Sequence, residues 1–216
     1  MKRHWCAERA TRAYVETVKA VKPRGFPTNA SSELVAAMAA GSGARVILEA
    51  WAAGDGMGTT VALSIAGRHT GARHVCLVPD ERAREEYEAG ARTAGAGETA
   101  EVVVGEAEEV MASLPEVDFV VVDCRRKDFA KVLRFAKIGS RGAFLVGKNA
   151  GQRGFRWRGV VGSGTRIVRS AFLPAGKGME IAQVVAGGGL AGHASGKSRW
   201  IKHVDHCTGE EHVFRR

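Results

Sequence analysis

The residues of this sequence best placed to do chemistry are carboxylates that stand where short apolar segments end. There are four such carboxylates: Glu49, Asp80, Glu106 and Asp123. Apolar segments that alternate with helical segments are typical of a parallel sheet covered on both faces. Ligands of open α/β sheets bind at the edge where the strands end. We therefore expect these carboxylates to meet at one ligand site.

A glycine-rich segment follows the first of these acids. Gly54-Asp55-Gly56-Met57-Gly58 lies between a strand expected at 45–50 and an apolar helix expected at 57–68. Glycines let the backbone approach a ligand, and the N–H groups that begin a helix can bind it. The spacing differs from the dinucleotide pattern G-x-G-x-x-G. The segment favours a nucleotide-like ligand, and a tight turn is the alternative.

Three of the acids need a closer interpretation. Asp80 follows 22 residues after Gly58, a spacing that suits a bond to ribose, but it could equally cap a helix that starts at Glu81. Glu106 could stabilise a helix N-terminus instead of contacting a ligand. Asp123 follows a run of three valines, and a carboxylate after so apolar a segment needs a partner.

The elements that position these residues predict an α/β fold with a doubly wound, Rossmann-like sheet. Helices at 5–21 and 31–40 come first. Strands are then expected at 45–50, 74–78, 101–104, 117–123 and 143–146, with helices at 57–68, 81–94, 106–113 and 127–137. An antiparallel hairpin, 166–173 with 179–185, closes the sheet. We expect one domain over 1–186, a flexible glycine-rich linker at 187–197 and a hairpin extension at 198–216.

This order of acids and glycines resembles the class I S-adenosylmethionine-dependent methyltransferases. Within them the chain is similar to the small caffeoyl-CoA and catechol O-methyltransferases. It also resembles an uncharacterised plant family of methyltransferase-like proteins that is defined by a domain of unknown function. The segments that carry this second resemblance span nearly the whole chain: 35–41, 73–76, 104–111, 126–130 and 210–216.

The resemblance implies a cofactor, S-adenosylmethionine, and a role for each candidate residue. The glycine segment and the acid that precedes it would hold the methionine part of the cofactor; these residues are Glu49, Gly54, Asp55, Gly56 and Gly58. Asp80 would lie near the ribose, and Glu106 with Ala107 would line the adenine. Asp123 would stand at the mouth of the acceptor pocket. A methyl group would pass to the acceptor by direct in-line displacement, for which alignment of the two reactants matters most.

Two departures from the family pattern affect the chemistry. Pro79 occupies the position expected for the ribose acid, so Asp80 is displaced by one residue. In metal-dependent O-methyltransferases of this type, an Asp-Asn pair after the fifth strand supplies metal ligands. In this sequence Asn149 matches the Asn, but Lys148 stands in place of the Asp. A cation opposes a divalent metal that needs oxygen ligands, so we expect no catalytic metal. We expect Lys148 to pair with Asp123 as a structural ion pair, with a role as base the alternative.

The charge is distributed unevenly. The chain has 216 residues and a net charge of +9; residues 1–124 hold 13 basic and 18 acidic residues, and residues 125–216 hold 19 and 5. Basic and aromatic residues interleave at Arg153, Arg156, Trp157 and Arg158, which suits an anionic acceptor or RNA. The alternative function is therefore a catalytically degenerate methyltransferase fold that binds RNA or a protein partner through its basic half.

Composition and the pattern of apolar residues limit which classes of protein this sequence can belong to. With 45% hydrophobic residues the chain can form a core, and no apolar run is long enough for a transmembrane helix or a signal peptide. The four cysteines form no C-x-x-C pair, which favours a reduced compartment. We expect a cytoplasmic or nuclear protein with no membrane partner. The methyl acceptor and the oligomeric state are left open by the sequence.

Overall fold

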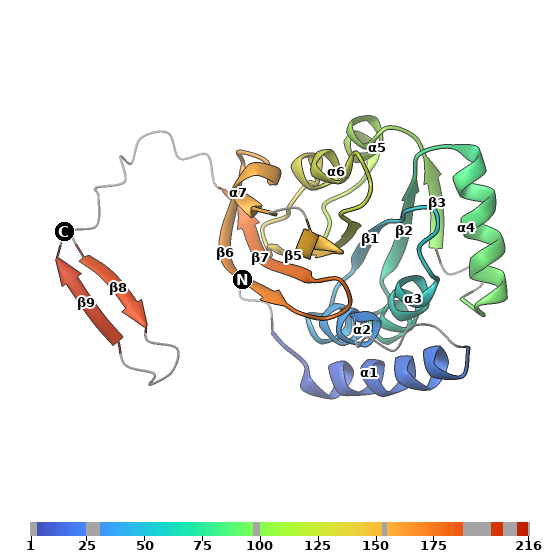
Figure 1. Ribbon diagram of the computed structural model, residues 1–216, viewed down its shortest axis with the longest axis horizontal. Coiled ribbons are helices and arrows are strands. Elements are labelled where there is room, and N and C mark those ends of the chain that lie inside the picture. Colours follow the sequence, from blue (N-terminus) through green and yellow to red (C-terminus); the bar gives the residue numbers. More distant parts are fainter. Residues whose placement is uncertain are drawn as a thin grey trace.

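The computed structural model describes residues 4–24, 31–96, 100–152, 155–187, 200–204 and 211–215. It contains a seven-stranded sheet in the order β3-β2-β1-β4-β5-β7-β6 (Figure 1). The strands are β1 (Val46–Ala50), β2 (Arg73–Val78), β3 (Ala100–Val104), β4 (Phe119–Asp123), β5 (Ala143–Lys148), β6 (Thr165–Leu173) and β7 (Met179–Ala186). Strands β1 to β5 pair in parallel, and β7 lies antiparallel between β5 and β6. The predicted α/β fold is confirmed.

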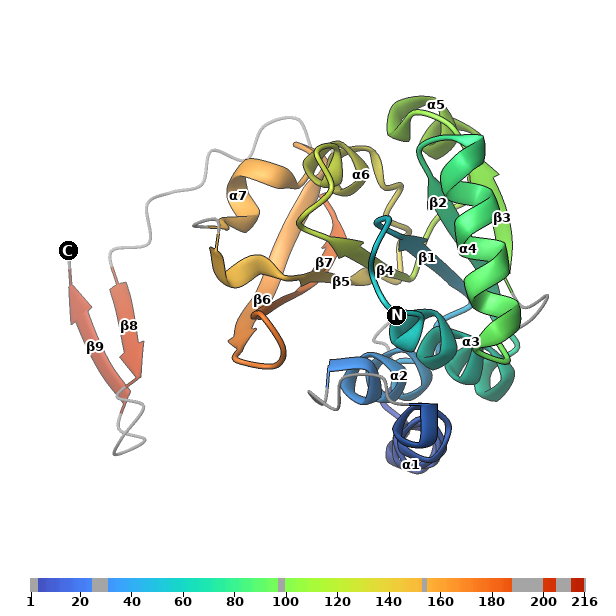
Figure 2. The ribbon, with the colours of Figure 1, turned by 45° about the vertical axis from the view of Figure 1, so that its right-hand side comes forward.

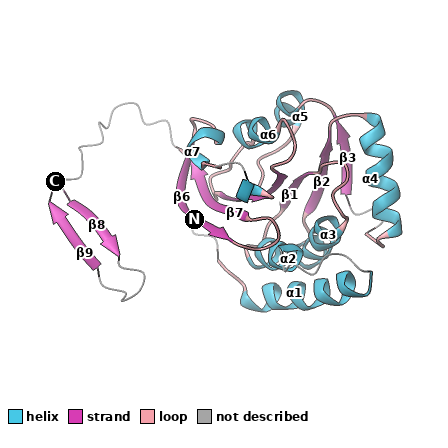
Figure 3. Cartoon of the chain, in the orientation of Figure 1, coloured by secondary structure: helices cyan, strands magenta, loops and turns pink. Residues whose placement is uncertain are grey.

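Helices cover both faces of this sheet (Figures 2 and 3). One face carries α1 (Ala7–Val21), α2 (Ser31–Gly41), α3 (Gly58–Thr70) and α4 (Glu81–Thr93); the other carries α5 (Ala107–Ser113), α6 (Phe129–Phe135) and α7 (Trp157–Val160). Successive strand side chains point to opposite faces, so Ile47 joins the first core and Leu48 the second. Burial on both faces explains why the central strands are continuously apolar.

Local sequence explains where the helices nearest the strand ends begin and stop. The Asp80 carboxylate accepts a hydrogen bond from the backbone N–H of Ala83 at 2.8 Å and so caps α4. This is one of the two roles that the sequence predicts for Asp80. Helix α3 stops at Gly71, whose φ of 68° is accessible to glycine at little cost. These two ends fix how the chain enters and leaves the sheet on either side of β2.

The C-terminal segment contains two further strands. β8 (Trp200–Val204) and β9 (Glu211–Arg215) pair antiparallel, with His203 opposite His212. The linker expected at 187–197 lies, apart from residue 187, outside the described residues, so the domain boundaries stay a prediction. Within the described part of the chain, no helix has the length and apolarity needed to cross a membrane.

Candidate cofactor and acceptor site

The carboxyl ends of β1 to β5 meet at one edge, as the sequence predicts, but at different depths. Glu49 of β1 is level with Val121 of β4, two residues before Asp123. Asp123 is in turn level with Lys148 of β5. At about 3.3 Å per residue, Glu49 therefore lies about 7 Å further from the edge than Asp123.

Glu49 is buried beneath α3 and α4 and does not face the edge. Its carboxylate accepts hydrogen bonds from Thr60 Oγ1 at 2.9 Å and the Tyr87 hydroxyl at 3.2 Å, and His74 Nε2 lies 3.1 Å from it. Burial raises the pKa of Tyr87, and the neighbouring Glu49 carboxylate raises it further. The pKa of the Cys76 thiol is raised for the same two reasons. The expectation that Glu49 contacts a cofactor is therefore corrected: it organises a polar cluster inside the core.

The glycine segment crosses the edge between β1 and α3. Gly54 has a φ of 74°, and its N–H donates to Glu86 of α4 at 3.2 Å. A side chain at Gly58 would place its Cβ 2.9 Å from Ser32 Oγ, so glycine lets α2 and α3 approach each other without displacing the Ser32 side chain. The segment is thus tied to α4 on one side and to α2 on the other.

A cleft of ≈ 580 Å³ opens over the ends of β1, β2, β3 and β4. It is lined by Trp51, Ala52, Ala53, Pro79, Asp80, Glu106, Arg125, Arg126, Lys127 and Asp128. Two predicted residues, Asp80 and Glu106, therefore meet here. Ala107 is not among the described residues that line the cleft, and its side chain is fully buried in the second core, so its role at the adenine stays a prediction.

Arg126 closes the floor of this cleft. Its guanidinium is buried and donates to two strand-end carbonyls, Trp51 O at 2.6 Å and Leu77 O at 3.0 Å. It also forms two hydrogen bonds with the Asp128 carboxylate. Burial alone would raise the pKa of Asp128, but these bonds lower it. The sequence assigns Arg126 no role of its own, although it belongs to a basic triplet after Asp123 and begins segment 126–130, which carries the family resemblance.

A network of ion pairs joins the mouth of the cleft to β5. Arg125 contacts Asp123 at 2.6 Å and Asp55 at 3.0 Å, and Asn149 donates to Asp123 at 3.0 Å. Lys148 donates to Asp55 at 2.7 Å and to the hydroxyl of Thr59. The expected Lys148–Asp123 ion pair is therefore wrong: the two residues are level in the sheet, but each uses a different partner.

The protonation of Asp123 follows from these partners. Burial opposes its charged form, but hydrogen bonds from the Arg125 side chain, the Arg125 backbone and Asn149 outweigh it and lower the pKa of Asp123. Asp123 is therefore a poor general base at neutral pH. It is an anchor for Arg125, which in turn holds Asp55 of the glycine segment.

The donor set at this edge does not fit a catalytic divalent metal. Asp123 and Asn149 offer oxygen ligands, but the cations of Arg125 and Lys148 already neutralise the adjacent carboxylates. Among the described residues, no group of three or more His, Cys, Asp and Glu side chains is arranged to hold a metal ion.

The aromatic and basic strip after β5 differs from its prediction. Trp157 is only 6% exposed, and its indole N–H donates to Glu180 at 3.1 Å. Its ring packs edge-to-face on Phe155 and is not available to stack on a base, which corrects that expectation. Arg156 and Arg158 are exposed, and Arg153 lies outside the described residues.

A family model described as Protein of unknown function (DUF1442) matches residues 1–216. The chain belongs to this family. No curated protein matches the sequence of this DUF1442 chain.

Three solved structures similar to the DUF1442 chain are methyltransferases. One from Geobacter sulfurreducens has 20% sequence identity and a TM-score of 0.55, and the match covers 81% of this chain and 90% of the Geobacter chain. The SAH-bound methyltransferase PaMTH1 from Podospora anserina has 15% identity, a TM-score of 0.52, and coverage of 85% and 89%. The SAH-bound O-methyltransferase from Bacillus cereus has 16% identity, a TM-score of 0.50, and coverage of 80% and 90%. At these identities the similarity shows the fold, which is the Rossmann-like methyltransferase fold.

Proposed function

We propose that this protein binds S-adenosylmethionine and transfers its methyl group without a catalytic metal. The observation that carries the proposal is the cleft of ≈ 580 Å³, which is bounded by the chain segments that follow four parallel strands. Its volume lies within the range of about 300–1,000 Å³ that small-ligand sites have. Similar solved structures hold SAH, which supports the choice of ligand.

The residues present fit such a ligand. Trp51, Ala52, Ala53 and Pro79 give an apolar wall for an adenine ring. Trp51 itself is almost fully buried, and its indole N–H has no hydrogen-bond partner in the described structure. Asp80 uses one carboxylate oxygen for the α4 cap, and Glu106 is exposed at the rim. Both are positioned to accept from ribose hydroxyls or the adenine amine.

The chain's own residues account for alignment rather than for proton transfer. When bound, S-adenosylmethionine supplies an electrophilic methyl group on a positively charged sulfur. Arg126 fixes the strand ends beneath the cleft, and Arg125, which lines the cleft, holds Asp55 of the glycine segment. These contacts hold the floor and the glycine segment rigid, so the two reactants can be aligned with little reorganisation.

Calorimetric titration with S-adenosylmethionine and S-adenosylhomocysteine tests the proposal. Ala53 is exposed and lines the cleft, so Ala53→Trp should fill it without disturbing the core. We expect wild-type binding and a loss of affinity of at least about tenfold in Ala53→Trp, since a tenfold change corresponds to about 1.4 kcal/mol. Ala112→Trp, at an exposed position on α5, is the matched control and should bind like the wild type.

The competing function is a degenerate methyltransferase fold that serves as a binding module for RNA or a protein. Two features favour it: Lys148 in place of a carboxylate, and the exposed arginines Arg156 and Arg158. No heat of binding at millimolar cofactor would reject the enzyme and leave this candidate. The plant origin and the cytoplasmic or nuclear location stay predictions.

A further inference from the structure

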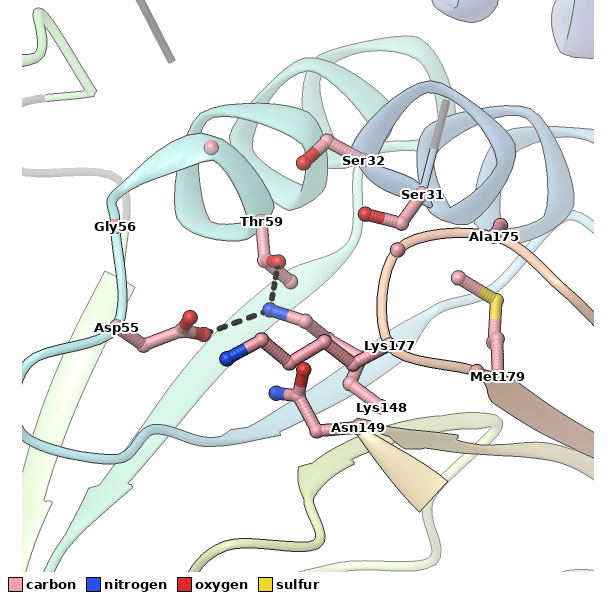
Figure 4. Close-up of a pocket in the computed structure, with 13 residues that line it drawn as sticks. Ser31, Ser32, Asp55, Gly56, Thr59, Lys148, Asn149, Ala175, Lys177 and Met179 are labelled. Atoms are coloured by element: carbon pink, nitrogen blue, oxygen red, sulfur yellow. Dashed lines mark hydrogen bonds and ion pairs between the residues drawn. The ribbon is translucent and has the colours of Figure 1, made fainter. Parts of the chain in front are cut away.

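A second, smaller cavity lies on the β5 side of the glycine segment (Figure 4). Four parts of the chain line it: the start of α2, the glycine segment with the first turn of α3, the end of β5, and the loop between β6 and β7. Its volume is ≈ 90 Å³. Because this is less than a fifth of the ≈ 580 Å³ of the cofactor cleft, the space suits a small chemical group and not a whole cofactor.

The lining of this cavity is rich in hydrogen-bond donors. Lys148 is 12% exposed and gives two N–H groups to Asp55 and Thr59. An ammonium has three N–H groups, so one donor remains for a ligand. The amide of Asn149 and the side chain of Lys177 lie on the same side of the cavity as Lys148 (Figure 4).

The described side chains that line the cavity carry a net positive charge. Two lysines line it, and both α2 and α3 begin there, so the positive ends of two helix dipoles converge on it. Among the described residues that line the cavity, Asp55 is the single carboxylate. Its charge is already shared by Lys148 at 2.7 Å and Arg125 at 3.0 Å, so it does not offset Lys177.

The loop that carries Lys177 is held in place by backbone contacts. It is bonded to the short helix η3 (Ala150–Gln152), through Ala150 N to Gly178 O at 3.0 Å and Gly151 N to Lys177 O at 3.1 Å. Gly178 has a φ of 89°, and a Cβ there would lie 2.8 Å from Gly151 N. A glycine is therefore required for this close packing, which keeps the loop beside the end of β5.

We propose that this cavity binds an oxyanion group, a carboxylate or a phosphate, carried by the methyl acceptor. The inference rests on the proposed function and names its substrate class. Lys177 provides the charge that is left once Lys148 pairs with Asp55, and directed donors come from the third Lys148 N–H and from the Asn149 amide N–H that is not given to Asp123. The Asp55–Arg125 pair joins this cavity to the cofactor cleft, because Asp55 lines the one and Arg125 lines the other. The bound group is thereby placed beside the methyl donor.

The test is an amide-resolved NMR titration at low ionic strength with inorganic phosphate and, separately, acetate. We expect saturable shifts confined to residues 56–60 and 148–152 and to the loop at 175–179, and the tighter of the two probes identifies the preferred oxyanion. Lys177→Gln should weaken phosphate binding about tenfold, by analogy with other charge-assisted contacts. Arg92→Gln, which removes the same charge from an exposed position on α4, should leave it unchanged. Shifts that are unsaturable, or equally weakened in both variants, would overturn the proposal.

A parallel titration with S-adenosylhomocysteine separates this inference from the proposed function. Lys177→Gln should keep the cofactor affinity of the wild type within about twofold. An equal loss of cofactor and phosphate affinity would mean that the cavity receives the cofactor's own carboxylate, which would overturn the acceptor assignment. If wild-type protein binds no cofactor, the proposed function fails, while the phosphate titration still decides whether the oxyanion site exists.

Discussion

Two carboxylates near the ends of adjacent parallel strands, Glu49 of β1 and Asp123 of β4, have opposite surroundings. Glu49 is buried under α3 and α4 and contacts a hydroxyl, a phenol and an imidazole. Asp123 is equally shielded, but it contacts the guanidinium of Arg125, which is 41% exposed. Both strands are apolar and run in the same direction. The two acids therefore differ in their distance from the sheet edge and in the side chains that contact them.

Depth follows from register. Glu49 is level with Val121, two residues short of the edge that Asp123 reaches. At that depth the helices above supply only side chains of the first core, so its carboxylate must be satisfied inside the protein. At the edge, cations from loops can reach a carboxylate while their far ends stay in water. A difference of two residues in position along the strand therefore decides whether an acid near the strand end is enclosed in the core or stands at the ligand-binding edge.

The largest effect should come from the deeper acid. Glu49→Ala removes the acceptor of buried donors on Thr60 and Tyr87, and we expect a loss of about 3–5 kcal/mol in the free energy of unfolding. Urea denaturation followed by circular dichroism measures it. Glu101→Ala on β3, which removes an exposed ion pair with Arg73 of β2, is the control and should cost under about 1 kcal/mol. Equal losses in the two variants would contradict the difference between core and edge.

An intermediate effect is expected where a cation joins two strand ends. Arg126→Leu leaves the carbonyls of Trp51 and Leu77 without this donor, and we expect a loss of about 2–3 kcal/mol by the same urea assay. Arg126→Lys keeps the charge but not the planar fork, so it should recover less than half of the loss. Arg134→Leu, exposed on α6, is the control. Full rescue by lysine would show that charge alone matters there.

Sequence reasoning predicted the fold because its signals are local. Apolar runs such as 119–122, the cap at Asp80 and the glycine segment each lie within a few residues, and each was found close to the expected bounds. The antiparallel closing hairpin was predicted for the same reason, from two β-rich segments around a short loop.

The site was predicted less well because its contacts depend on register and on distant partners. Lys148 and Asp55 are 93 residues apart, and nothing in either segment indicates that Lys148 reaches Asp55 instead of the neighbouring Asp123. Arg125 is the exception, since an arginine two residues after a strand-end aspartate is a local signal that could have been used. Lys177 gave no signal, because only the closed hairpin loop brings it to β5.

The smallest effect concerns the acid at the edge, and its dependence on pH sharpens the comparison. Asp123→Asn keeps the shape but weakens the bonds to Arg125, and we expect a loss of about 1–2 kcal/mol at neutral pH. The pKa of Asp123 is lowered in the folded state from its ordinary value of 3.8. Its contribution is therefore present above that value and is lost as the pH falls through the lower folded-state pKa.

The stability difference between wild type and Asp123→Asn should accordingly stay flat from about pH 7 to about pH 5 and shrink below about pH 4. Urea titrations at each pH measure the difference, in which the contributions of acids outside the Asp55–Arg125–Asp123 network cancel. A difference that grows on acidification would mean that Asp123 is held protonated, as burial without its cations would require. In that case Asp123 would resemble a buried acid without charged partners, and the network to Asp55 could not anchor the glycine segment.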